Sequence, residues 1–136
     1  MYKHTVQYYE TDKMGITHHS NYIRFMEEAR VDFMAKIGWD YATMEKNGIF
    51  SPVIGIECKF KKPSTFSDEI FIDLKIIEYK DIRIKFSYDM YNKDGALIFT
   101  GTSEHCFING EGKIVIPRKI NPALDEKLKE FALQNS

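Results

Sequence analysis

The sequence predicts an α+β domain in which an antiparallel sheet wraps around one long central helix. One stretch carries apolar residues at helical spacing, and the segments after it carry them at alternate positions. Turn signals separate those segments. An amphipathic helix needs an apolar surface to cover it, and consecutive strands with one apolar face supply that surface. We therefore expect a single domain over residues 1–136, with a further helix at its C-terminus.

Composition excludes several classes of protein. The 19 Lys and Arg residues nearly balance the 20 Asp and Glu residues, so the net charge is −1 and no basic excess indicates nucleic-acid binding. Apolar residues make up 43%, enough for a folded core. No apolar run reaches the roughly 18–20 residues of a membrane span, and residues 1–7 show no export signal. Cys58 and Cys106 are expected to be reduced, buried thiols of a cytoplasmic protein.

The first half of the chain predicts a strand and then the central helix. Residues 3–9 mix Thr, Val and Tyr and predict the strand, and residues 10–15 form a polar turn. The helix should begin at Ser20 or Asn21, either of which can cap it, and end at Gly38. Its apolar face comprises Tyr22, Phe25, Met26, Ala29, Phe33 and Ile37. Its polar faces carry residues that can form four-residue ion pairs, namely Arg24, Glu28, Asp32 and Lys36.

The second half predicts the sheet. After a loop at 39–50, a period of two predicts strands at 53–62, 70–77, 82–91 and 97–108, with 113–116 extending the sheet. The third of these strands alternates most strictly, which indicates one apolar and one polar face. Turn signals stand at 92–95 and 109–112. Asn121 and Pro122 predict the cap and first residue of the C-terminal helix.

Residues 8–22 combine two carboxylates, two adjacent histidines and the predicted helix start. This segment resembles the N-terminal motif of the 4-hydroxybenzoyl-CoA thioesterase family, which includes the acyl-CoA thioesterases of the Tol–Pal gene cluster and has the hotdog fold. The matching residues are Tyr9, Glu10, Thr11, Asp12, Gly15, His18, His19, Asn21 and Tyr22, followed on the helix by Phe25, Glu28, Ala29 and Arg30. The strand pattern and the turn at 63–68 also fit, so the resemblance covers most of the chain.

The resemblance implies that Asp12 is the catalytic carboxylate and that the backbone N–H of His19 polarises a thioester carbonyl. Physical chemistry agrees, because a helix N-terminus presents unpaired N–H groups and stabilises a developing oxyanion. A thiolate leaves with little help from a general acid. The sequence leaves open whether Asp12 attacks the carbonyl or activates water, and whether the His19 side chain orients water or substrate. In the alternative interpretation, Asp12 only fixes the turn before the helix.

A CoA carrier needs basic side chains for its phosphates, and the resemblance matches the turn at 80–83 to a CoA-contacting segment. Several residues are therefore expected to contact the substrate. These are Tyr8, Gly15, His18, Asn21, Tyr22, Lys61, Lys62, Lys80 and Arg83. Coenzyme A is then part of the substrate, and no cofactor is expected. Hotdog proteins pair their sheets edge to edge, so a homodimer or homotetramer is expected, with active sites built from both chains.

The expected function is hydrolysis of an acyl-CoA thioester to the free acid and CoA. Two alternatives stay open: hydrolysis of acyl groups on acyl carrier protein, which would dock on Lys59, Lys61 and Lys62, and a non-catalytic acyl-binding hotdog module. A metal site at His18 and His19 is rejected, because adjacent histidines point apart. His4 and His105 are expected to be structural residues.

Overall fold

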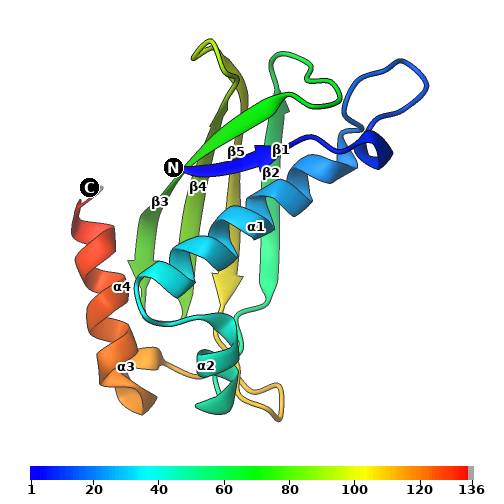
Figure 1. Ribbon diagram of the computed structural model, residues 1–136. Coiled ribbons are helices and arrows are strands. Elements are labelled where there is room, and N and C mark those ends of the chain that lie inside the picture. Colours follow the sequence, from blue (N-terminus) through cyan, green and yellow to red (C-terminus); the bar gives the residue numbers. More distant parts are fainter. Residues whose placement is uncertain (135–136) are drawn as a thin grey trace.

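The computed structural model describes residues 1–134, which form one five-stranded antiparallel sheet crossed on one face by the long helix α1 (Ser20–Lys36) (Figure 1). The strands are β1 (Tyr2–Thr5), β2 (Val53–Phe60), β3 (Glu69–Lys80), β4 (Arg83–Tyr91) and β5 (Leu97–Cys106). Their order in the sheet is β1-β3-β4-β5-β2, and each neighbouring pair is antiparallel. The predicted α+β architecture is confirmed.

The core lies between α1 and the sheet, and the predicted apolar faces form it. The buried residues of α1 include Tyr22, Phe25, Met26, Ala29 and Met34, and Phe33 is half-buried beside them. From the sheet, β4 contributes alternate residues that are all buried, namely Ile84, Phe86, Tyr88 and Met90. Each large apolar side chain that is fully buried stabilises the fold by about 1.5–3 kcal/mol. The alternation in residues 82–91 therefore predicted correctly which side chains of this strand lie on the inner face of the sheet.

The N-terminal boundaries differ from the prediction. The first strand ends at Thr5, because Tyr8–Glu10 forms a short 3-10 helix, η1. Helix α1 is preceded by His19 as its N-cap, with no side-chain cap hydrogen bond, so the expected caps Ser20 and Asn21 lie inside the helix. The side chain of Asn21 donates instead to the main-chain carbonyl of Glu10, at 2.9 Å. This bond ties the helix to the segment before it.

Two short helices were not predicted, one inside an expected loop and one just after the expected strand at 113–116. The expected loop at 39–50 contains α2 (Tyr41–Lys46), whose N-cap Asp40 accepts from the N–H of Thr43. Residues 113–116 add only an isolated bridge to the sheet, and α3 (Pro117–Ile120) follows. The C-terminal helix α4 (Pro122–Gln134) is confirmed, with Asn121 Oδ1 accepting from Leu124 N–H at 3.2 Å. Six and four residues are too few to show a helical period in the sequence.

Strand β2 is an edge strand with unusually exposed apolar side chains. The exposed fractions are 44% for Val53, 49% for Ile54, 38% for Ile56 and 52% for Phe60. One edge of β2 pairs with β5, and within residues 1–134 no strand pairs with its other edge. An open, apolar edge strand is a template for pairing with another chain.

A chain of hydrogen bonds between polar side chains crosses the core from α1 to the start of β2. Arg30 Nη1 donates to the hydroxyl of Tyr88 at 3.0 Å, and that hydroxyl lies 2.6 Å from Ser103 Oγ. Ser103 Oγ lies 2.8 Å from His105 Nε2, and His105 Nδ1 lies 3.2 Å from the carbonyl oxygen of Ser51. A carbonyl only accepts, so His105 carries its proton on Nδ1 and accepts from Ser103 on Nε2. The predicted structural role of His105 is thereby confirmed.

The buried ring of His105 makes stability depend on pH. Burial, followed by the positive charge of Arg30, lowers the pKa of His105 from 6.5 to about 4. Between these values the unfolded chain binds a proton that the folded chain excludes, so acidification favours unfolding. We expect the free energy of unfolding to fall by up to about 3 kcal/mol more in the wild type than in His105→Gln from pH 6.5 to pH 4. Urea titrations across this range measure the difference, and parallel curves for the two proteins would contradict it.

Candidate active site

The segment between η1 and α1 folds back on itself and presents Asp12 beside the helix. Asp12 N–H donates to the carbonyl of Ile16, and Gly15 N–H donates to the carbonyl of Asp12, both at 2.9 Å. Gly15 has a φ of 80°, a conformation that side chains disfavour. Asp12 Oδ1 accepts from Met14 N–H at 2.8 Å, whereas Oδ2 accepts no hydrogen bond from residues 1–134. One carboxylate oxygen therefore fixes the turn, and the other is available for chemistry.

Helix α1 starts next to this turn with an uncommitted N–H group. His18 N–H donates to the carbonyl of Glu10 at 2.8 Å, and Ser20 N–H donates to His18 Nδ1 at 3.3 Å. Between them, His19 N–H donates to no acceptor in the described part of the chain. Unpaired N–H groups at a helix N-terminus attract negative charge.

Asp12 and His19 line one cavity of about 290 Å³. Three other predicted site residues line it as well: Tyr22, Lys61 and Lys62. The Tyr22 hydroxyl lies 2.8 Å from Ser64 Oγ, and its ring stacks on Phe99. Phe60, at the end of the exposed edge strand β2, also lines this cavity. We call it the Asp12 cavity.

The β2–β3 turn holds the Asp12 segment in place. Thr17 N–H donates to the carbonyl of Ser64 at 2.7 Å, and Thr17 Oγ1 lies 2.6 Å from Ser64 Oγ. Thr65 Oγ1 donates to the carbonyl of Gly15 at 2.6 Å. These bonds join residues about 50 positions apart, so they fix the segment to the sheet.

The other predicted residues near the motif do not line the Asp12 cavity. Tyr8 is 78% exposed and packs on Phe66, with ring centroids 5.6 Å apart. His18 is exposed, and its Nδ1 lies 2.8 Å from Ser20 Oγ. Asn21 is buried and holds the Glu10 carbonyl, while Gly15 shapes the turn. The structure gives Asn21 and Gly15 structural contacts that position the Asp12 segment.

Lys80 and Arg83 lie at the opposite end of the sheet from Asp12 in the same chain. They face each other across the β3–β4 turn, and Arg83 lies opposite Cys106 of β5. At the Asp12 end, Phe60 lies opposite Phe99, which lies opposite Met90 of β4. The seven positions from Arg83 to Met90 span roughly 23 Å. Arg83 Nη1 lies 3.3 Å from Glu104 Oε1.

A buried cluster around His4 positions the segment that carries Asp12, and sequence reasoning missed its partners. His4 Nε2 lies 2.8 Å from Glu10 Oε1, and His4 Nδ1 lies 2.9 Å from Glu28 Oε1. Tyr2 donates to the same oxygen of Glu28 at 2.7 Å. Carboxylates only accept, so both contacts of the ring are hydrogen bonds when each nitrogen carries a proton. Glu28 was expected to form a pair within its helix; it binds β1 instead.

The helix does contain one of the expected four-residue pairs, because Asp32 Oδ2 lies 3.0 Å from Lys36 Nζ. Within residues 1–134, no cluster of three or more His, Cys, Asp or Glu side chains is arranged to hold a metal ion. Cys58 and Cys106 form no disulfide, and both are half-buried and not fully buried as expected, because neither side chain points completely into the core between α1 and the sheet. None of the described helices is long and apolar enough to cross a membrane.

The chain matches the family model described as the Thioesterase-like superfamily over residues 6–131. The chain belongs to the Thioesterase-like superfamily. It is 36% identical over 106 residues to YneP of Bacillus subtilis, provisionally named an acyl-CoA thioesterase, covering 78% of this chain and 77% of YneP. The crystal structure of the DHNA-CoA thioesterase from Staphylococcus aureus superposes with a TM-score of 0.94 at 31% identity, covering 98% of this chain and 91% of that one.

A 1,4-dihydroxy-2-naphthoyl-CoA hydrolase of Thermosynechococcus vestitus is 27% identical over 105 residues, covering 76% of this chain and 72% of that protein. The likeness to these relatives confirms the predicted hotdog fold. It shows that the chain is a member of the superfamily, but it does not assign the chain to the 4-hydroxybenzoyl-CoA branch that the sequence motif resembles.

The His4 cluster of this thioesterase-like protein should contribute strongly to stability. We expect His4→Gln to lower the free energy of unfolding by about 3 kcal/mol. The substitution removes the ring that joins the Glu10 and Glu28 carboxylates, and of the donors to the Glu10 carboxylate in the wild-type structure only the N–H of Gln7 remains. Adding Glu10→Gln should restore part of the loss, since two amides can bond without a buried charge. Urea unfolding of the single and double variants measures both effects.

Lys3→Gln is the matched control, because Lys3 lies on the same strand and forms an exposed ion pair with Glu69. Its cost should stay below about 1 kcal/mol. A His4 variant as stable as the Lys3 variant would contradict the account of this cluster.

Proposed function

We propose that this protein hydrolyses acyl-CoA thioesters to the free acid and CoA, with Asp12 as base or nucleophile. The observation that carries the proposal is the shared lining of one cavity by Asp12, whose Oδ2 is uncommitted, and by His19, whose N–H is uncommitted. A carboxylate and an N–H donor are the two groups that thioester hydrolysis requires. The motif's resemblance to the 4-hydroxybenzoyl-CoA thioesterase family supports the same roles.

In the proposed reaction, the thioester carbonyl oxygen accepts from His19 N–H at the positive end of α1. Asp12 Oδ2 either takes a proton from a water molecule that attacks the carbonyl carbon, or attacks that carbon itself to give a mixed anhydride that water then hydrolyses. The tetrahedral oxyanion is stabilised by the same N–H. The C–S bond breaks and CoA leaves as a thiolate, which takes up a proton without needing a strong acid in the site.

The lining also supports a CoA carrier. Lys61 and Lys62 line the Asp12 cavity and are exposed, where they can bind phosphate oxygens. Relatives and structural neighbours are named for CoA thioesters, including 1,4-dihydroxy-2-naphthoyl-CoA and gentisyl-CoA. This favours acyl-CoA over acyl carrier protein, for which the structure offers only the same short run of lysines. It also favours an enzyme over a non-catalytic acyl-binding module.

A second copy of the chain is the proposed cover for β2. Antiparallel pairing of two β2 edges about a two-fold axis would join the two sheets and bury the apolar side chains that are now exposed. If the axis passes between Ile56 and Glu57, Val53 lies opposite Phe60 of the second copy. Because Phe60 lines the Asp12 cavity, each active site then lies at the interface between copies.

Asp12→Asn should abolish most of the activity without unfolding the protein. The amide keeps a carbonyl oxygen for the Met14 N–H bond but is neither a base nor a nucleophile, so kcat/KM for acyl-CoA hydrolysis should fall at least about 10²-fold. Thiol release followed with a chromogenic disulfide measures the rate, while circular dichroism and size-exclusion chromatography check the fold. Wild-type turnover in this variant would remove Asp12 from the mechanism.

His19 allows the backbone donor to be tested separately from the side chain. Its φ of −55° matches the value that a proline ring imposes, so His19→Pro removes the N–H while keeping this dihedral angle. We expect kcat to fall about 10²-fold in His19→Pro, as for loss of one oxyanion donor. His19→Ala keeps the N–H and reports on the side chain alone. Equal rates in the alanine and proline variants would exclude the proposed donor.

A further inference from the structure

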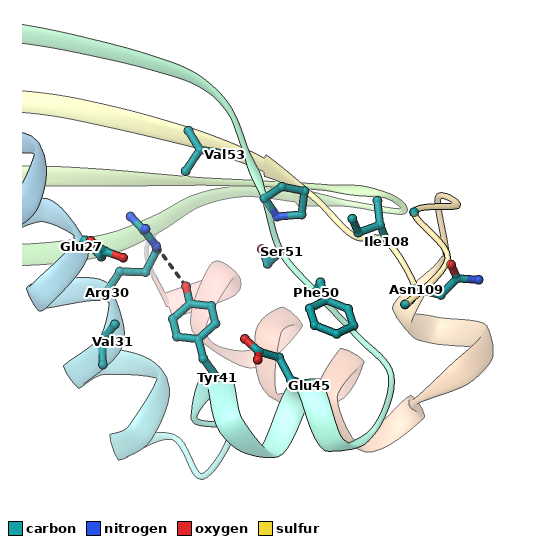
Figure 2. Close-up of a pocket in the computed structure, with 13 residues that line it drawn as sticks. Glu27, Arg30, Val31, Tyr41, Glu45, Phe50, Ser51, Val53, Ile108 and Asn109 are labelled. Carbon is teal, nitrogen blue, oxygen red and sulfur yellow. Dashed lines mark hydrogen bonds between the residues drawn. The ribbon is translucent and has the colours of Figure 1, made fainter.

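A cavity larger than the Asp12 cavity lies elsewhere in the chain. It has a volume of about 640 Å³ and is lined by α1, α2, the residues that lead into β2 and the turn after β5 (Figure 2). Arg30 and Tyr41 lie on one side and Phe50 and Ile108 on the other, as Figure 2 shows. We call it the Arg30 cavity. Arg30 follows His19 by 11 residues along α1, or roughly 16 Å, so the two cavities are separate within one chain.

Arg30 is a buried cation without a carboxylate partner. It is 8% exposed, and no ion pair among residues 1–134 includes it. Its Nη1 donates to Tyr88 and its Nε donates to Tyr41, both at 3.0 Å, which leaves Nη2 uncommitted. In the described chain, every fully buried side-chain nitrogen or oxygen has a hydrogen-bond partner. The uncommitted Nη2 must therefore be accessible, and Arg30 lines this cavity.

Tyr41 supplies a second donor. Its oxygen accepts from Arg30, so its own O–H remains free to donate. Burial raises the pKa of Tyr41, so the hydroxyl keeps its proton at neutral pH. Arg30 and Tyr41 are adjacent and both line the cavity, so two donors can converge on one acceptor atom.

The remaining lining indicates the kind of molecule that carries this acceptor. The apolar side chains Val31, Phe50, Pro52, Val53 and Ile108 form most of the wall. Glu27 and Glu45 also line it, so one Arg against two Glu leaves a formal charge of −1. A net negative lining disfavours a carboxylate ligand, whereas an uncharged oxygen can accept from Arg30 and Tyr41. The cavity thus fits a mostly apolar group that carries a hydroxyl or keto oxygen.

The β2 edge connects this cavity with the catalytic one. Val53 lines the Arg30 cavity and Phe60 lines the Asp12 cavity, at opposite ends of β2. The seven positions between them span roughly 23 Å, too far for a short acyl group. In the two-fold pairing proposed above, Val53 lies beside Phe60 of the second copy. The Arg30 cavity of one copy then adjoins the Asp12 cavity of the other.

We propose that the Arg30 cavity binds the acyl group of a thioester held at Asp12 of the second copy, and that Arg30 and Tyr41 recognise an uncharged hydroxyl or keto oxygen at the far end of that group. The inference rests on the proposed thioesterase function for its substrate. Tyr41 and Arg30 are specificity residues in this arrangement, because they contact the acyl group and not the reacting carbonyl. The CoA part of the thioester, which is the leaving group, binds to the copy that supplies Asp12.

The first test compares matched thioesters that differ only in the distal oxygen. We expect wild-type kcat/KM to be about tenfold higher for 4-hydroxybenzoyl-CoA than for benzoyl-CoA, and Tyr41→Phe to remove most of this preference. Glutaryl-CoA should gain nothing over pentanoyl-CoA, because its distal oxygen is charged. The assignment would be overturned if the wild type shows no preference for the hydroxyl group, or if Tyr41→Phe keeps that preference. A preference for glutaryl-CoA over pentanoyl-CoA would also overturn it.

Tyr79→Phe is the matched control, since the Tyr79 hydroxyl donates to Asp125 and lines neither cavity. It should retain the hydroxyl preference of the wild type. Tyr41 is the better variant than Arg30 for this test, because Arg30 also holds Tyr88 in the core.

Mixed dimers test whether the two cavities act across copies. An Asp12→Asn chain and a Tyr41→Phe chain are co-expressed with different affinity tags, and the heterodimer is purified. If each site lies within one chain, no site of this heterodimer has both Asp12 and Tyr41. If each site combines two chains, one site has both. The purified heterodimer should then show the wild-type preference for 4-hydroxybenzoyl-CoA. The reduced preference of the Tyr41→Phe protein would overturn the arrangement across copies.

Equilibrium binding separates this inference from the proposed function. The Kd values of 4-hydroxybenzoyl-CoA and benzoyl-CoA for the Asp12→Asn protein, measured by calorimetry, do not depend on turnover. They should differ by about tenfold, and by much less in the Asp12→Asn/Tyr41→Phe protein. Equal Kd values would overturn the Arg30 cavity as an acyl site, whereas absent thiol release with this binding difference intact would overturn only the hydrolytic function.

Discussion

The hydrogen bonds of Glu10 fix the relation between the Asp12 turn and the start of α1. Its main-chain carbonyl accepts from His18 N–H and from the side chain of Asn21, and its carboxylate contacts His4 of β1. One residue therefore joins the first strand, the turn and the central helix. Together with the bonds of the β2–β3 turn to Thr17 and Gly15, this junction fixes the Asp12 carboxylate relative to the N–H of His19. Catalytic groups need such fixed positions to stabilise a transition state.

The edge strand β2 is the second constraint on the site. Its apolar side chains are exposed, and its two ends line two different cavities. Pairing of this edge with a second copy would bury the exposed side chains and bring the unlike cavities together. Fold stability, assembly and substrate recognition are then linked through one strand. The buried polar chain from Arg30 to Ser51 supports the same region, because it ends at the residues that lead into β2.

The sequence predicted those features that repeat along one segment. The spacing of Tyr22, Phe25 and Met26 encodes the buried face of α1, and the motif around Asp12 indicated the loop that approaches the helix start. The pairing of Glu28 with His4 was not predictable in the same way, because 24 positions separate the two residues and no local period records their contact.

The Arg30 cavity escaped prediction for a related reason. It needs Tyr41 from α2, a helix of six residues with only Met44 buried, which leaves no helical period to recognise. The exposure of β2 could not be predicted either. A strand has the same alternating sequence pattern whether its apolar side is covered by its own chain or by another. Lys80 and Arg83 were grouped with the site by resemblance, and the sheet register places them at its far end in the same chain.

The central claim is that the Asp12 cavity hydrolyses acyl-CoA thioesters, and a thiol-release assay of the unmodified protein across acyl-CoAs tests it most directly. The panel should contain short, long, branched and aromatic acyl groups, with an acyl carrier protein thioester as comparison. The account predicts saturable release of CoA from at least one acyl-CoA, faster than from the carrier protein thioester. No release above the uncatalysed rate from any acyl-CoA would contradict it.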